Sequence, residues 1–201
     1  MALFYQSPTR NLPDGYTFCG ATLKDIPVII YLLNQRQMSN PNAGNLNFDE
    51  MRKIWQTSQI NPALDVRLVF DRREQLTGYI EVWTNNELAS QPWLWGCVHP
   101  AYEGRGIGTT LLRWAEARVR LALEILPKNL RVAARFGILS TLDKAPSLCQ
   151  GLGWQLLCQP QTNKPGAMPG LIQKTSLPVN SAYDIYEKVI RSADELIQQV
   201  D

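Results

Sequence analysis

The stretch that decides the fold is VHPAYEGRGIGT, residues 98–109, which lies between two apolar segments. The segment before it, Trp93–His99, is short and rich in aromatic residues, as a buried strand is, whereas Thr109–Leu126 carries apolar residues at helical spacing. Glycine at positions 104, 106 and 108 lets the backbone approach a ligand closely. Unpaired N–H groups at the start of a helix favour phosphate. The stretch therefore predicts an anion-binding loop that leads into a helix.

Two common nucleotide-binding loops do not fit this stretch. The Walker pattern requires Gly-Lys-Ser/Thr, and residues 98–109 contain no lysine. The dinucleotide pattern G-x-G-x-x-G, counted from Gly104 and Gly106, has Thr109 where the third glycine should stand. The anion is therefore expected to be of another kind.

The stretch resembles the signature of the GNAT superfamily of acyl-CoA-dependent N-acyltransferases, roughly Arg/Gln-x-x-Gly-x-Gly/Ala after a V-x-P strand end. A second stretch, which starts at Ala145, is similar to the family segment Ala-x-x-Leu-Tyr-x-x-x-Gly-Phe. The order of predicted strands and helices resembles that of the family over nearly the whole chain. The residues that carry the resemblance are Val98-x-Pro100, Tyr102, Gly104-Arg105-Gly106-Ile107-Gly108, Leu111-Leu112, and Ala145…Leu148-Cys149…Gly153-Trp154.

We expect an α/β (α+β) fold with a mixed, mostly antiparallel central sheet of about six to seven strands flanked by helices. Asn47 and Glu50 form a capping-box pattern at the start of one helix, which Asn61-Pro62 is expected to end. Residues 1–178 would form the acyltransferase domain. Residues 179–201 would add an amphipathic helix, over Ser181–Val200, packed on the domain or at a homodimer interface. Strands are expected over 16–22, 65–70, 76–83, 93–99, 130–136, 154–159 and 171–177, and further helices over 24–38, 109–126 and up to residue 151.

The resemblance implies acetyl-CoA as the acyl donor and no metal. The strand that ends at Cys97 and Val98 would run beside the pantetheine arm, with the Val98 backbone N–H facing the thioester oxygen. Arg105 is a candidate for a phosphate contact, with a solvated arginine as the alternative. The pyrophosphate would be held by the backbone of Glu103, Gly104, Arg105, Gly106, Ile107 and Gly108, with the Thr109 hydroxyl as an extra donor.

Three positions depart from the family pattern. Glu103 stands where the family prefers Arg or Gln, and we expect its carboxylate to point into solvent. Leu142 stands where the family has asparagine. Cys149 replaces a tyrosine that protonates the departing thiolate, so it is either a substitute donor or a packed small side chain.

An amine acceptor is almost wholly ammonium at neutral pH, so a general base is expected. Glu81 is the candidate because a carboxylate in the middle of an apolar strand is unexpected unless it serves a pocket. An outward-facing residue or a buried ion pair is the alternative. His99 is a second, weaker candidate. Three tryptophans either line an acceptor cleft or pack in the core: Trp83, Trp93 and Trp95.

The composition excludes several other classes of protein. The 201 residues include twenty Lys and Arg against eighteen Asp and Glu, a net charge of +2, so no general attraction to nucleic acid or to an anionic membrane is expected. One histidine and four cysteines without zinc-like spacing argue against a metal site and favour free thiols in a reducing compartment. The longest apolar run, Val28–Leu33, is too short to cross a bilayer. We therefore expect a cytoplasmic protein.

The sequence thus predicts an acetyl-CoA-dependent N-acetyltransferase that moves an acetyl group to an amine of a small molecule or peptide by direct attack. No residue suggests an activated nucleophile for a covalent intermediate. Two alternatives stay open: a catalytically weak or inactive CoA-binding or interaction module, and a truncated half of a tandem acetyltransferase.

Overall fold

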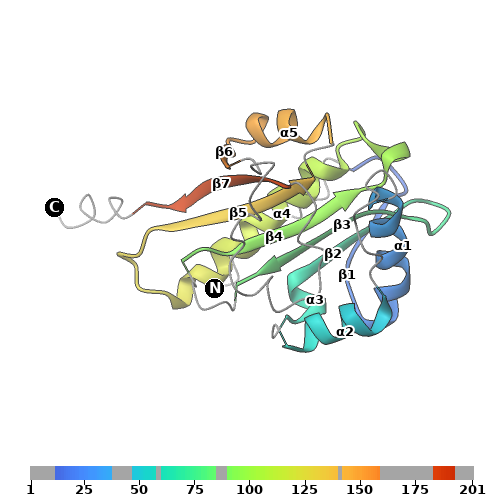
Figure 1. Cartoon of the computed structure of the whole chain (residues 1–201), viewed down its shortest axis with the longest axis horizontal. Coiled ribbons are helices and arrows are strands. Elements are labelled where there is room, and N and C mark those ends of the chain that lie inside the picture. The colour runs from blue at the N-terminus through green and yellow to red at the C-terminus, as the bar shows by residue number, and fades with distance from the viewer. Residues whose placement is uncertain are drawn as a thin grey trace, which may run out of the picture.

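The computed structural model describes residues 12–37, 47–57, 60–84, 90–139, 142–158 and 183–192. These residues form a seven-stranded sheet in the order β1-β2-β3-β4-β5-β7-β6 (Figure 1). Neighbouring strands are antiparallel except β4 and β5, which run parallel. The predicted mixed, mostly antiparallel sheet is therefore confirmed. The strands are β1 (Thr17–Gly20), β2 (Val66–Phe70), β3 (Leu76–Trp83), β4 (Trp93–Val98), β5 (Val132–Leu139), β6 (Gln155–Cys158) and β7 (Tyr183–Arg191).

Helices cover both faces of the sheet. On one face, apolar residues of β3 and β4 pack with α1 and α2, and on the other face they pack with α4 and α5. Figure 1 shows α1 and α2 at the end of the sheet formed by β1 to β3. The α-helices are α1 (Ile26–Gln37), α2 (Phe48–Thr57), α3 (Pro62–Asp65), α4 (Ile107–Ala122) and α5 (Ala145–Gly151), joined by the short 3-10 helices η2 (Leu23–Asp25), η3 (Pro100–Tyr102) and η4 (Leu123–Ile125).

The start of α2 is capped as the sequence predicts. The backbone N–H of Glu50 donates to Asn47 Oδ1 at 2.9 Å, and the backbone N–H of Asn47 donates to Glu50 Oε2 at 3.2 Å. The prediction that Asn61-Pro62 ends this helix is wrong, because α2 already ends at Thr57. Asn61 instead caps α3, because its side chain accepts the N–H of Ala63 and Pro62 occupies the first turn, where a missing N–H does no harm.

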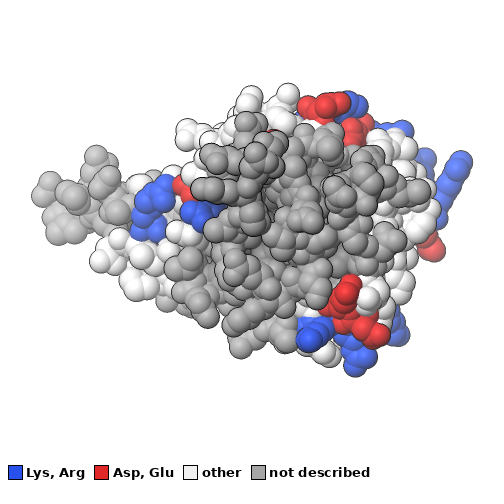
Figure 2. Space-filling view, in the orientation of Figure 1, with Lys and Arg blue, Asp and Glu red and all other residues white. Residues whose placement is uncertain are grey.

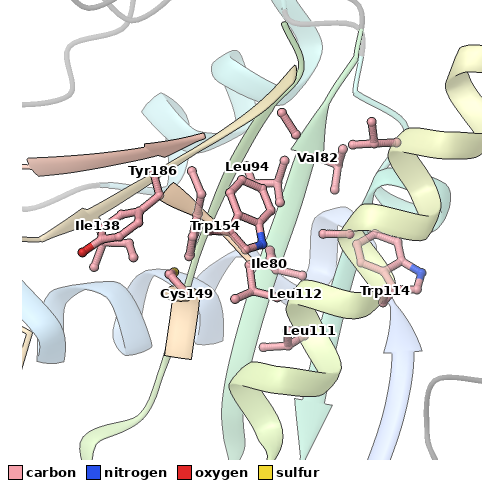
Figure 3. Packing of buried hydrophobic residues seen from close by; sticks show 14 of the residues in the cluster. Ile80, Val82, Leu94, Leu111, Leu112, Trp114, Ile138, Cys149, Trp154 and Tyr186 are labelled. Carbon is pink, nitrogen blue, oxygen red and sulfur yellow. The ribbon is translucent and has the colours of Figure 1, made fainter. Parts of the chain in front are cut away.

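Strand β3 is buried along its whole length and divides the two cores. Alternate side chains face opposite sides of a strand. Ile80 and Val82 therefore pack toward α4 (Figure 3), whereas Tyr79 and Trp83 pack toward α1 and α2. Glu81 belongs to this second face by the same alternation.

The predicted C-terminal helix is wrong over residues 183–191, which form strand β7 between β5 and β6. The error has a physical cause. A spacing of four, as between Ile185 and Val189, fits the helical period and also the strand period of two. The homodimer that was predicted with it stays a prediction. The predicted strand over 171–177 lies outside the described residues.

The described helices include none that is long and apolar enough to cross a membrane. On the face of the molecule seen in Figure 2, the described Lys and Arg side chains lie interspersed with Asp and Glu.

Candidate active site

The candidate site lies where strands β4 and β5 separate. They pair at Trp93 with Arg135 and at Leu94 with Phe136, and their register includes no further pair over the described residues. A cavity of about 430 Å³ opens beyond this point. It is lined by Gly96, Cys97 and Val98 of β4, by Phe136 and Ile138 of β5, and by residues of the glycine-rich loop, α4 and α5.

The glycine-rich loop between β4 and α4 takes a conformation that side chains disfavour. Gly104 and Gly106 have φ values of 78° and 79°, in the left-handed region. A Cβ at Gly104 would meet nothing within 4 Å, so this position faces open space. Gly106 is the N-cap of α4, and no side chain caps that helix terminus. The first N–H groups of α4 are thus available to an anion at the end of the cavity.

The backbone N–H of Val98 faces the space between β4 and β5. The N–H of the next residue, His99, donates to Thr77 O on β3 at 2.8 Å. In an antiparallel pair, successive residues direct their N–H groups to opposite sides, so the N–H of Val98 points away from β3 and toward β5. This direction is the one required of a donor to a ligand held between β4 and β5.

Most of the predicted loop residues meet in this one cavity, but two do not. Cys97, Val98, Glu103, Gly104, Gly106, Gly108 and Thr109 all line it, as does Cys149. Ile107 is buried against β3 instead. A Cβ built on Gly78 of that strand would come within 2.6 Å of the Ile107 Cγ2 atom. Arg105 lies outside the cavity lining, with its guanidinium 4.8 Å from the centre of the Tyr102 ring.

Glu103 does not extend into solvent as expected. Its side chain is 24% exposed and lines the cavity, and its Oε2 atom lies 3.6 Å from Nζ of Lys144. Lys144 is the N-cap residue of α5, so this ion pair joins the glycine-rich loop to that helix. The expectation failed because Lys144, from a distant part of the chain, supplies a counter-charge next to the loop.

Cys149 lies at the inner wall of the cavity and is fully buried. Figure 3 shows it in the same layer as Ile138 and Trp154. Burial raises the pKa of the Cys149 thiol to about 12. The thiol therefore stays protonated at neutral pH.

Glu81 is buried on the opposite face, 6% exposed, and accepts a hydrogen bond from Trp55 Nε1 at 3.0 Å. Burial raises the pKa of its carboxyl, although hydrogen bonding from Tyr79 and Trp55 limits the rise. The buried indole N–H of Trp83 has no hydrogen-bond partner among the described residues. Tyr79 lines the cavity, whereas Glu81 is not among the described residues that do.

The three tryptophans all pack in or against the core on the face of the sheet that α1 and α2 cover. Trp83 and Trp93 are buried in the core. Trp95 is half-buried and stacks on Trp93, with ring centres 6.0 Å apart. A Cβ at Gly137 would come within 2.8 Å of the Trp95 ring, so the indole lies across β5. None of the three is among the described residues that line the cavity, so their part in an acceptor cleft stays a prediction.

His99 has a structural contact of its own. Its Nδ1 accepts the backbone N–H of Ala101 at 3.2 Å and so caps η3. Next to it, the Tyr102 hydroxyl donates to Asp71 Oδ2 at 2.6 Å, which lowers the pKa of Asp71. These contacts fix the segment between β4 and the glycine-rich loop.

The sequence did not predict the roles of Lys144, Phe136 and Ile138 in the cavity. A lysine directly before the Ala145 segment was the available signal for Lys144. The residues that the structure describes contain no group of three His, Cys, Asp or Glu side chains that could hold a metal ion.

Residues 65–137 match the family profile described as "Acetyltransferase (GNAT) domain". No curated protein sequence matches the chain. Among solved structures, the chain is similar to a GCN5-related N-acetyltransferase from Sphaerobacter thermophilus, with 23% identity and a TM-score of 0.65, over 72% of this chain and 45% of that one. It is similar to a phosphinothricin acetyltransferase from Sinorhizobium meliloti in complex with AcCoA, with 16% identity and a TM-score of 0.61, over 88% and 89% of the two chains. It is also similar to the ribosomal-protein-S18-alanine N-acetyltransferase from Escherichia coli, with 12% identity and a TM-score of 0.58, over 90% and 97%.

The chain thus spans less than half the length of the Sphaerobacter protein but nearly the whole length of the other two. At these identities, the solved structures establish the fold. The profile match covers β2, β3, β4, the glycine-rich loop, α4 and most of β5, which are the elements that build the cavity. Over residues 65–137, the chain is therefore similar to a GNAT acetyltransferase domain.

Proposed function

We propose that the protein transfers an acetyl group from acetyl-CoA to an amine of a small molecule or peptide, by direct attack in a ternary complex. The observation that carries this proposal is the cavity between β4 and β5, which leads to the uncapped N-terminus of α4. The narrow pantetheine arm and the pyrophosphate that follows it are the parts of CoA that such a cavity suits. One solved relative of this fold is a complex with AcCoA.

The residues present fit CoA. The pantetheine arm would lie between β4 and β5, beside Gly96 and Val98. The pyrophosphate would accept backbone N–H groups from Gly104 to Thr109, where the positive φ angles of the glycines and the open space at Gly104 leave room. The Val98 N–H would donate to the thioester oxygen as negative charge develops on it.

The acceptor amine must lose a proton to react. At pH 7, removing the proton from an amine of pKa about 10.4 costs about 4–5 kcal/mol. Glu81 is the proposed base, and its raised pKa brings it closer to the working pH. Because Tyr79 lines the cavity and Glu81 does not, the proton would reach Glu81 through the Tyr79 hydroxyl, which accepts it while passing its own proton to the carboxylate.

The leaving thiolate needs no acid from the protein. With a pKa of about 12, Cys149 would protonate a CoA thiolate of pKa about 8.5 only against a difference of about 5 kcal/mol. Cys149 is therefore proposed as a packing residue in the wall of the cavity, and the thiolate would take its proton from water.

The acceptor is proposed only as an amine. The solved relatives include proteins named for spermidine, for phosphinothricin and for an alanine of a ribosomal protein, each under 25% identical to this chain. Such different acceptors on one fold mean that the loops around the site decide specificity.

Two measurements test the proposal. Calorimetric titration with acetyl-CoA should give saturable heat, and the absence of heat up to millimolar ligand would overturn it. Release of free CoA is then followed with a polyamine, with free amino acids and with a peptide bearing a free N-terminus. Binding without release on a broad amine panel would support the alternative of a non-catalytic CoA-binding module, which the buried Glu81 and the cysteine at position 149 favour.

A further inference from the structure

We infer that Lys144 is the side chain that pairs with the pyrophosphate of CoA, and that Glu103 holds this lysine beside the loop until the ligand arrives. The inference rests on the proposed function, because it assigns a ligand contact within the same cavity. It replaces Arg105, the basic residue that the loop sequence suggests, with a residue from α5.

The Arg105 side chain makes its contacts outside the cavity. Its guanidinium stacks on the Tyr102 ring at 4.8 Å and donates to the Ala101 carbonyl at 3.3 Å and to the Tyr16 hydroxyl at 3.4 Å. It is not among the residues that line the cavity. Contact with a phosphate inside the cavity would require all three of these interactions to break.

Lys144 already lies at the cavity. Among its described lining residues, Lys144 is the one cation and Glu103 the one anion. The lysine side chain is 74% exposed and is therefore free to reorient, and its Nζ lies 3.6 Å from Glu103 Oε2. A pair this long and this exposed is weak and readily exchanged.

The charges favour an exchange when the ligand binds. A pyrophosphate beside Gly104 would place more negative charge near Lys144 than the single carboxylate of Glu103 does. That same carboxylate would repel the phosphate. Glu103 therefore competes with the ligand for Lys144 and lowers the affinity for CoA, while it keeps the lysine within reach of the loop.

The test is calorimetric titration of CoA, at low and at moderate salt, into the wild type and four variants: Lys144→Met, Glu103→Gln, Lys128→Met and Arg105→Met. We expect Lys144→Met to weaken CoA binding by about tenfold at low salt and less at higher salt, as a charge-assisted contact should. Glu103→Gln should tighten binding by about threefold. Lys128→Met makes the same change of net charge at an exposed position outside the cavity lining, and it should leave the affinity within about twofold.

Dephospho-CoA, which lacks the 3′-phosphate but keeps the pyrophosphate, shows which of these two groups Lys144 contacts. The loss caused by Lys144→Met should be the same for CoA and dephospho-CoA. If it disappears with dephospho-CoA, the lysine contacts the 3′-phosphate and the assignment is wrong. Melting curves of each variant check that it is folded.

Failure of this inference is distinct from failure of the proposed function. If the wild type binds no CoA, the proposed function fails. If the wild type binds CoA and Lys144→Met binds equally well, or if only Arg105→Met weakens binding, the inference fails and the function stands.

Discussion

At the scale of single residues, Glu81 should limit stability while serving the reaction. Its folded-state pKa is raised above the ordinary value of 4.5 by burial. Between these two values the folded state binds more protons than the unfolded state, so stability falls as pH rises through that window. In Glu81→Gln the buried charge is gone, yet the amide oxygen can still accept the Trp55 N–H. We expect a melting temperature about 2–4 °C higher at pH 7, and kcat about 10²-fold lower with unchanged CoA affinity.

The gain in melting temperature should shrink toward pH 4.5, where Glu81 itself becomes protonated. Glu116→Gln is the matched control on the other face of the sheet. Glu116 is equally buried but paired, accepting Trp154 Nε1 at 3.0 Å and Lys188 Nζ at 2.8 Å. Its replacement leaves Lys188 without its counter-charge and should destabilise the fold by about 1–3 kcal/mol. A Glu81→Gln variant that melts lower than the wild type at pH 7 would show that the fold stabilises the buried carboxylate by more than its desolvation costs.

Cys149 should contribute packing and no proton. A general acid contributes about 10²–10⁴-fold to a rate, whereas we expect Cys149→Ala to change kcat by less than about threefold. The measurement is acetyl transfer at saturating acetyl-CoA across pH 6–9, with CoA affinity measured in parallel. A fall of a hundredfold in kcat with intact CoA binding would instead make the thiol the proton donor, despite its high pKa.

At the scale of elements, the contact between β3 and β4 depends on Gly96. A Cβ at this position would lie 2.4 Å from the Tyr79 carbonyl oxygen and 2.9 Å from the Ile80 Cα, and backbone atoms in a sheet cannot move aside cheaply. We expect Gly96→Ala to destabilise the fold by about 2–3 kcal/mol in urea unfolding, the upper part of the usual range for overpacking of a core. It should also weaken CoA binding, because Gly96 lines the cavity.

Gly151→Ala is the matched control within a helix. Gly151 ends α5 with no heavy atom within 4 Å of a built Cβ, and it is not among the glycines with positive φ. The change should therefore stabilise the fold by about 0.5–1 kcal/mol. Equal effects of the two substitutions would contradict the close approach of β4 to β3.

Local patterns predicted those elements that their own residues determine. The apolar run of β3, the Asn47 capping box of α2 and the glycine-rich loop before α4 all have local causes, and each was predicted. Strand β7 was not, because its place between β5 and β6 is decided by pairing with residues far away in the chain. The spacing of Ile185 and Val189 could not distinguish strand from helix, so tertiary pairing overrode the local pattern.

At the scale of the whole molecule, the candidate site likewise combines residues that local patterns predict with residues that only the tertiary fold brings to the cavity. Most of the predicted residues between Cys97 and Thr109 meet in one cavity because they belong to one continuous strand end and loop. Lys144 and Phe136 join them because β5 and α5 fold back against the loop. The position of Lys144 directly before the Ala145 segment was the sequence signal for this lysine. The burial of Glu81 beneath Trp55 has the same origin, since Trp55 lies 26 residues earlier, on α2. Side chains contributed by distant elements are therefore what the structure adds to the sequence.

The whole-molecule prediction concerns stabilisation by the ligand. Because the cavity joins β4, β5, the glycine-rich loop and α5, a ligand held there should oppose their separation on unfolding. At a ligand concentration of 100 times Kd, binding adds about 2.7 kcal/mol, which raises the melting temperature of a chain of this size by about 5–10 °C. CoA and acetyl-CoA should act alike, because they share the pantetheine arm and the pyrophosphate, whereas pantetheine alone should raise the melting temperature far less. The check is a series of melting curves with each compound at matched concentrations, and a shift by pantetheine equal to that by CoA would place the binding energy in the β4–β5 cleft rather than at the N-terminus of α4.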